Sequence, residues 1–322
     1  MSLATKAKGL LKTEGAGHAA RLTALFFGYL FAALLLAASL TYPLMQTGWI
    51  DHEPQRVMGR LAQVFILLGL WPFLRLMGLA NWQVLGFAPA RSRLLRAIGG
   101  GWLLGIGILG ALVLAELGLG VRVPDVDGLQ IPSLLEKVVA ALIGGLLIGL
   151  LEETFFRGAL YTAIRRRASV AAAAAGSALL YALVHFLKPH ALPSGIAFDW
   201  AGTWSMFLHV FAGLFQWPHL DSLLALFSAG VFLALVRERA GHIGWCIGLH
   251  AGWVFVIQLT RQVTDGDEAA SLAFLAGHYD GVIGWLAALW IALLAWDYWR
   301  ISAWWVTRRA PVTPNAASQV DP

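Results

Sequence analysis

Charged residues are scarce in this chain, and cysteine is almost absent. Only 13% of the 322 residues are charged, against roughly 25% in an ordinary soluble domain. The one cysteine, Cys246, excludes an intrachain disulfide and a CxxC-type metal site. The sequence also lacks an internal repeat and a low-complexity domain. The low charge excludes a water-soluble fold, so the remaining interpretation is a protein embedded in a membrane.

The chain instead contains long apolar runs. Hydrophobic residues make up 59% of the chain and mean hydropathy is +0.70, while 15 Trp and 35 Gly suit the bilayer interface and close helix packing. Eight runs are near the length that a membrane helix requires, except for the short sixth. They are 22–45, 61–79, 97–120, 138–164, 169–187, 223–236, 243–260 and 281–296. This pattern predicts an all-α, polytopic membrane bundle with about eight transmembrane helices.

The domain organisation follows from these runs. One membrane-embedded domain is expected over residues 21–304, between polar tails at 1–20 and 305–322. Before the sixth run, the aromatic stretch from Trp204 to Trp217 is expected to lie in the membrane interface or to re-enter the membrane.

Lys and Arg are distributed unevenly across the eight runs. Fifteen lie on the side that carries both termini and 6 on the other, while Arg75 and Arg157 fall within runs, which accounts for all 23. Because positive residues concentrate in cytoplasmic loops, both termini are expected in the cytoplasm. The net charge of +5 is explained in the same way, and nucleic acid is not expected as a partner.

Ionisable side chains in the fourth run form the first candidate site. A charge at the centre of a membrane helix costs roughly 2.5 to 3.5 kcal/mol, so such residues usually have a role or a partner. Glu153 and Arg157 are spaced to pair on one helix face, whereas Glu152 points about 100° away and lacks a local countercharge. Glu152 therefore suits a general acid or base. The alternative is a structural charge cluster that holds helices together.

Two histidines in other runs extend this candidate site. His185 ends the fifth run and His250 lies in the seventh. With Glu152 they provide one carboxylate and two imidazoles, which can hold a catalytic water either directly or through Zn²⁺. Gly248 and Gly252 lie on a different face of the seventh run from His250, so close packing there would leave His250 free to line a cavity.

Three motifs resemble the CPBP family of intramembrane proteases, also called the Abi or CAAX-protease family. Its Glu-Glu-x-x-x-Arg motif matches Glu152, Glu153 and Arg157. Its second motif, an aromatic residue four positions before His, matches Tyr181 and His185, with Tyr in place of the usual Phe. Its third motif matches at His250 but has Val254 where the family carries Asn or Asp. The resemblance covers a motif core of about residues 138–258.

The resemblance implies an eight-helix protease with catalytic residues Glu152, Glu153, Arg157, His185 and His250. By this resemblance Glu152 and His185 activate the hydrolytic water, and His250 holds the water or the developing oxyanion. Members have been described as metalloproteases and as metal-free glutamate proteases. Glu152, His185 and His250 would be the Zn²⁺ ligands if a metal is used, but a separate general base is then less obvious, which favours the metal-free alternative.

Two other classes of protein remain as alternatives. A non-catalytic membrane scaffold or immunity protein with the same fold is the stronger one, because Val254 replaces a motif residue. A proton-coupled transporter also uses buried Glu and His, but the repeats and paired broken helices common in transporters are not visible. The expected partners are membrane lipid and a protein or peptide substrate that enters from the membrane or the cytoplasmic side.

Overall fold

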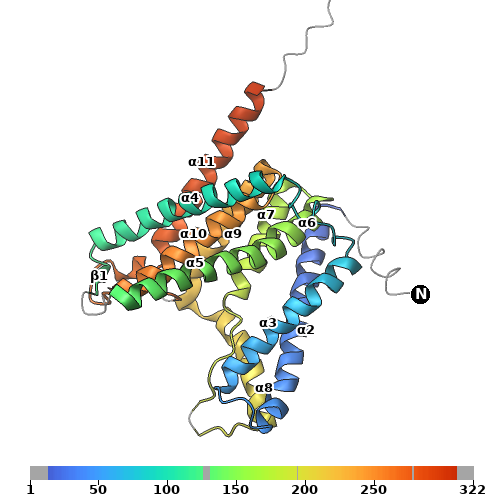
Figure 1. The fold of residues 1–322 in the computed structure, drawn as a ribbon, viewed down its shortest axis with the longest axis vertical. Helices are drawn as coiled ribbons and strands as arrows, with labels where there is room; N and C mark the ends of the chain where they lie inside the picture. Colours follow the sequence, from blue (N-terminus) through green and yellow to red (C-terminus); the bar gives the residue numbers. More distant parts are fainter. Residues whose placement is uncertain (1–13, 126–130, 194, 278, 310–322) are drawn as a thin grey trace, which may run out of the picture.

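The computed structural model describes residues 14–125, 131–193, 195–277 and 279–309, and within these a helix forms most of each of the eight apolar runs (Figure 1). The seven single helices and one composite helix are α2 (Gly15–Gln46), α3 (Pro54–Leu76), α4 (Arg91–Gly118), α5 (Ile131–Glu153) continued by η1 (Thr154–Tyr161) and α6 (Thr162–Arg165), α7 (Val170–Val184), α9 (Leu220–Ala240), α10 (Gly244–Val263) and α11 (Trp285–Arg309). The expected all-α membrane bundle is therefore present.

The expected count of eight membrane-spanning helices is not confirmed. Among the described residues, five helical segments are long and apolar enough to cross a membrane: Gly15–Gln46, Pro54–Leu76, Arg91–Gly118, Leu134–Arg165 and Trp217–Ala240. The sixth run was expected to be short, but its helix, α9, continues beyond the run through a charged turn to Ala240. It therefore belongs to one of the five segments. The fifth run instead forms the short helix, α7, with 15 residues.

The first and last helices extend into the polar ends of the chain. Helix α2 begins at Gly15, inside the predicted tail at 1–20, and α11 continues to Arg309, inside the predicted tail at 305–322. The remaining parts of both tails, 1–13 and 310–322, lie outside the described residues.

Helices α2 and α3 pack with a short helix from the aromatic stretch. Helix α8 (Trp200–His209) begins at the Asp199 side chain, which accepts a hydrogen bond of 2.8 Å from the Gly202 amide. The 3₁₀ turns η2 (Val210–Phe215) and η3 (Trp217–His219) lead from it to α9. The three helices enclose a separate apolar core whose members include Leu34, Ala38, Met58, Met206 and Phe207. Figure 1 shows them extending together away from the layer of α4, α5 and α10.

A two-stranded ribbon joins the far ends of α4 and α10, which the all-α expectation did not include. Strand β1 (Arg122–Pro124) pairs antiparallel with β2 (Thr264–Gly266), with Val123 opposite Asp265. The buried Arg122 guanidinium donates to the Thr264 hydroxyl at 2.8 Å and to the Thr264 carbonyl at 2.7 Å. The short η4 turn (Ala273–Leu275) follows before α11.

Glycines set how closely α10 approaches its two neighbours. A Cβ on Gly248 would lie 2.2 Å from the Ile98 carbonyl oxygen of α4, and one on Gly252 would lie 2.5 Å from the Trp102 carbonyl oxygen. On the other side, a Cβ on Gly149 of α5 would lie 2.8 Å from the Ile247 carbonyl oxygen of α10. Such backbone contact is available only to residues without a side chain. The expected close packing is confirmed, and it fixes α10 between α4 and α5.

Candidate active site

The carboxylate of Glu153 is the centre of the candidate site. Glu153 ends α5 and is fully buried. Its Oε1 atom lies 2.8 Å from Nη1 of Arg157 and 2.8 Å from Nδ1 of His250. The pair predicted from the spacing of Glu153 and Arg157 is thus present, but Glu153 is more than the partner of Arg157. It also contacts the imidazole of His250, which the sequence analysis had grouped with Glu152.

Arg157 lies in an unusual stretch of helix. The chain changes from α5 to the π-helical η1 directly after Glu153, and π-helical turns occur frequently at functional sites. Arg157 is fully buried, donates from Nη2 to the Gly230 carbonyl of α9 at 3.2 Å, and lies 4.5 Å from the centre of the Tyr181 ring. One guanidinium therefore ties α5, α7 and α9 together beneath the candidate site.

His250 presents its second nitrogen to Glu152. A carboxylate can only accept a hydrogen bond, so the contact with Glu153 places the proton of a neutral His250 on Nδ1 and leaves a lone pair on Nε2. Nε2 lies 3.7 Å from Oε2 of Glu152, too far for a direct hydrogen bond. This oxygen is buried and has no hydrogen-bond partner among the described residues. Two acceptors thus face each other at a separation that a donor such as water can bridge.

His185 lies at the edge of this group. It caps the C-terminus of α7, its Nδ1 is 2.7 Å from the Tyr181 carbonyl, and its ring is 4.6 Å from the Tyr181 ring. Tyr181 also lies edge-on to His250, at 5.9 Å between ring centres. Glu152 and His250 act on His185 electrostatically, although no hydrogen bond joins them within the described part of the chain. The Tyr residue that replaces the usual Phe is therefore the contact between the two histidines.

Glu152, His185 and His250 are the side chains that would bind Zn²⁺ if a metal is used. Within the described ranges, no group of three or more His, Cys, Asp or Glu side chains is arranged to hold a metal ion. Nε2 of His250 lies 3.7 Å from Oε2 of Glu152, whereas no hydrogen bond or ion pair joins His185 to either residue within the described ranges. The arrangement does not fit a three-ligand zinc centre, so no step below is derived through a metal.

At Val254 the third motif has a valine instead of an amide or carboxylate, and the Gln258 amide does not take its place. Gln258 lies two turns beyond His250, and its side-chain nitrogen is 3.8 Å from where a Cβ of Gly144 would be. This contact directs Gln258 to an earlier part of α5 than Glu152. The departure from the third motif is thus not compensated along the same helix.

Two residues beside His185 were missed by sequence reasoning. The Tyr279 hydroxyl donates to the His185 carbonyl at 3.0 Å, and Lys188 in turn donates to that hydroxyl. Tyr279 lies 94 residues from His185 and belongs to none of the three motifs, so no signal in the sequence connects the two.

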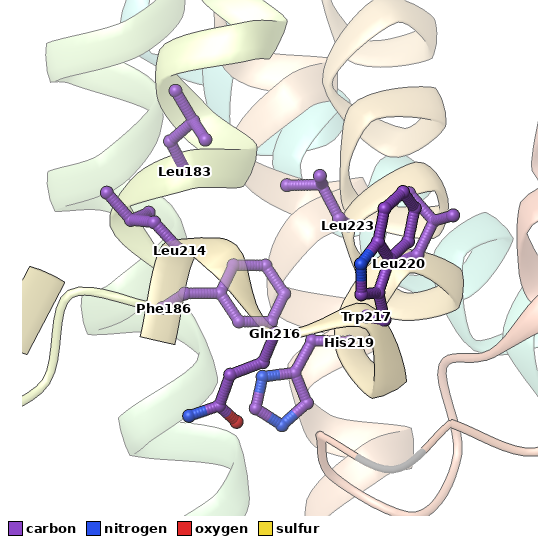
Figure 2. A pocket seen from close by; sticks show the side chains of 8 residues that line it. All are labelled: Leu183, Phe186, Leu214, Gln216, Trp217, His219, Leu220 and Leu223. Atoms are coloured by element: carbon purple, nitrogen blue, oxygen red, sulfur yellow. The ribbon is translucent and has the colours of Figure 1, made fainter. Parts of the chain in front are cut away.

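A cavity of about 410 Å³ lies on the other side of Phe186, the residue after His185. Figure 2 shows Phe186 and His219 next to each other in it, with ring centres 5.5 Å apart. Leu183 of α7 and Leu223 of α9 form further parts of its apolar wall. None of the five candidate catalytic residues lines this cavity, so it is separate from the group around Glu153.

The segment that carries these residues matches a known protein family. Residues 134–256 match the family model described as type II CAAX prenyl endopeptidase Rce1-like. The match includes all five candidate residues and confirms the family resemblance that the three motifs indicated. Comparison with the curated proteins and with the solved structures gave no match.

Proposed function

From the Rce1-like character of residues 134–256, we propose that the protein is an intramembrane endopeptidase in which Glu152 activates water to hydrolyse a peptide bond. The observation that carries the proposal is the unpartnered Oε2 atom of Glu152, which faces Nε2 of His250 at 3.7 Å. A water molecule that donates to both acceptors would be held with its oxygen lone pairs free for attack.

The proposed reaction begins with this water. Its oxygen attacks the carbonyl carbon of the scissile bond while one proton passes to Glu152, and the carbonyl oxygen becomes an oxyanion. The proton then passes to the leaving nitrogen, the C–N bond breaks, and the carbonyl re-forms as a carboxyl group. His185 assists Glu152 in activating the water, and His250 holds the water through the lone pair on Nε2.

Glu153 and Arg157 have a positioning role in this proposal. The Glu153 carboxylate fixes the orientation and tautomer of His250, as carboxylates commonly do for catalytic imidazoles. Arg157 neutralises Glu153 in a site from which water is excluded. Loss of either residue should therefore affect both folding and catalysis.

The first test compares membrane proteomes of cells that express the wild type or Glu152→Gln. Peptide ends that appear only with the wild type identify the substrate and its cleavage site, and a synthetic peptide with that site then serves for kinetics. Glu152→Gln, His185→Ala and His250→Ala should each abolish cleavage in a folded, membrane-inserted protein. Glu136→Gln, an exposed carboxylate earlier in α5, is the matched control and should cleave normally. Wild-type cleavage by Glu152→Gln would refute the mechanism.

A scaffold function is the alternative that Val254 favours. A scaffold needs no Glu152 carboxylate, so a membrane partner would bind the wild type and Glu152→Ala equally well. No new peptide ends would appear with the wild type. Co-purification of both proteins with crosslinked membrane partners distinguishes the two functions.

The proposed enzyme would have both termini and the Arg166 loop in the cytoplasm, as the distribution of Lys and Arg predicts. Reporter fusions at Arg166 and at the two termini test this orientation. Activity of a periplasmic or luminal reporter at Arg166 would show that the orientation is wrong.

A further inference from the structure

Tyr279 brings a second chain segment to the catalytic helices. Its hydroxyl donates to the His185 carbonyl at 3.0 Å, and its ring packs against Phe186 at 5.1 Å between centres. Tyr279 lies beyond residue 256, where the family match ends. The contact is therefore a feature of this chain that the family motifs do not describe.

The segment around Tyr279 is held on its far side. The Asp280 carboxylate accepts hydrogen bonds of 2.9 Å and 2.8 Å from the amides of Val282 and Ile283. The Arg122 guanidinium, which also fixes the β ribbon, donates to the Gly281 carbonyl. These bonds involve the two residues that follow Tyr279, so the hydroxyl is presented to His185 by an ordered turn.

Lys188 adds a positive charge to this contact. Its ammonium donates to the Tyr279 hydroxyl and lies 4.2 Å from the centre of the Tyr279 ring. The charged groups that act on Lys188 are Asp280, Arg261 and Glu152. The guanidinium of Arg157, by contrast, is committed to Glu153 and to the Gly230 carbonyl.

The directions of the two hydrogen bonds suit these roles. A carbonyl oxygen can only accept, so the Tyr279 hydroxyl is the donor in its contact with His185. The same hydroxyl oxygen accepts from Lys188, whose side chain is exposed on its other sides. The His185 carbonyl is therefore contacted by a phenol that is itself capped by the Lys188 amine nitrogen.

We infer that Tyr279 and Lys188 complete the active site: Tyr279 positions His185, and Lys188 supplies a positive charge on the His185 side of the site. This inference rests on the proposed peptidase function. The tetrahedral intermediate carries a negative charge, which a nearby fixed cation stabilises more in the transition state than in the ground state. Removal of the charge should consequently lower kcat and leave KM nearly unchanged.

The test uses the full-length protein in liposomes and the synthetic peptide identified with Glu152→Gln. Tyr279→Phe should lower kcat roughly three- to tenfold, the effect of one hydrogen bond. Lys188→Met should lower it by about tenfold, and Lys188→Arg should restore most of it because Arg keeps the charge. The matched controls, Tyr161→Phe at the Glu238 contact and Lys137→Met in α5, should keep the wild-type kcat.

The outcomes separate this inference from the proposed function. If the wild type cleaves and Glu152→Gln does not, the function stands whatever the other variants do. A folded Lys188→Met protein with wild-type kcat would then overturn the inference, and so would a Lys188→Arg protein as slow as Lys188→Met. If Tyr279→Phe fails to fold, as judged by thermal unfolding, the two Lys188 variants decide the matter.

Discussion

Two parts of the molecule are held together by different kinds of contact. The body, formed by α4, α5 and α10, brings backbones together through glycines such as Gly105 and Gly149. The arm, formed by α2, α3 and α8, has a core of side chains, which includes large and flexible ones such as Met58 and Phe207. Flexible side chains can adjust to a change in shape, whereas a backbone carbonyl in contact with a glycine cannot. The candidate catalytic residues of α5 and α10 lie in the part that adjusts least.

Ion pairs differ between the two parts in the same way. Glu153 and Arg157 in the body have no exposed side-chain surface. Glu53 and Arg56 in the arm form a pair of 3.0 Å with side chains 60% and 66% exposed. Burial makes a charge expensive once its partner is removed, and water makes the loss of an exposed pair inexpensive. The body therefore combines rigid packing with charges that must stay paired.

The largest effect is expected from breaking the buried pair. Arg157→Ala should lower the free energy of unfolding by about 3 to 5 kcal/mol and abolish cleavage, because the Glu153 carboxylate is left unpaired. Arg56→Ala in the arm should change it by less than about 1 kcal/mol. Thermal unfolding in one detergent measures both. An equal decrease in the free energy of unfolding for the two variants would show that the buried pair stabilises the protein no more than the exposed pair does.

A smaller effect is expected at the glycine contacts. A Cβ on Gly105 would lie 2.5 Å from the Leu249 carbonyl oxygen, next to His250, whereas one on Gly110 in the same helix meets nothing within 4 Å. Gly105→Ala should cost about 1 to 3 kcal/mol and also lower kcat, since α10 must shift. Gly110→Ala should be neutral or slightly stabilising. A Gly105→Ala protein as stable and active as Gly110→Ala would show that α10 can move without loss.

The body also shows which features a sequence can predict. The pairing of Glu153 with Arg157 depends only on helical spacing, so it was predictable from four residues of separation. The contact of Glu153 with His250 joins residues 97 apart and depends on how α10 is rotated against α5. The sequence named both glutamates but assigned His250 to Glu152 alone, because spacing says nothing about that rotation.

The same limit applies to the fold. Apolar runs predicted where the helices lie, but α9 continues through Arg237 and Arg239 to Ala240, so hydropathy underestimated its length. The β ribbon was not predictable, since its three-residue strands are 142 residues apart at Arg122 and Thr264. Tyr279 was missed for the same reason: its role depends on a contact in space with His185.

The smallest effect is expected at Val254, one helical turn beyond His250 on the least adjustable helix. Valine can neither donate nor accept a hydrogen bond, whereas asparagine at this position would add an amide donor for the oxyanion. Val254 is partly exposed, so the added amide can be solvated when no substrate is bound. Val254→Asn should keep the wild-type expression level and leave kcat unchanged or raise it a few-fold, because the added amide can donate to the oxyanion. Val254→Leu adds bulk without a donor and should not raise kcat. A clear drop in kcat for a well-folded Val254→Asn protein would mean that the oxyanion lies elsewhere, and it would favour the scaffold function.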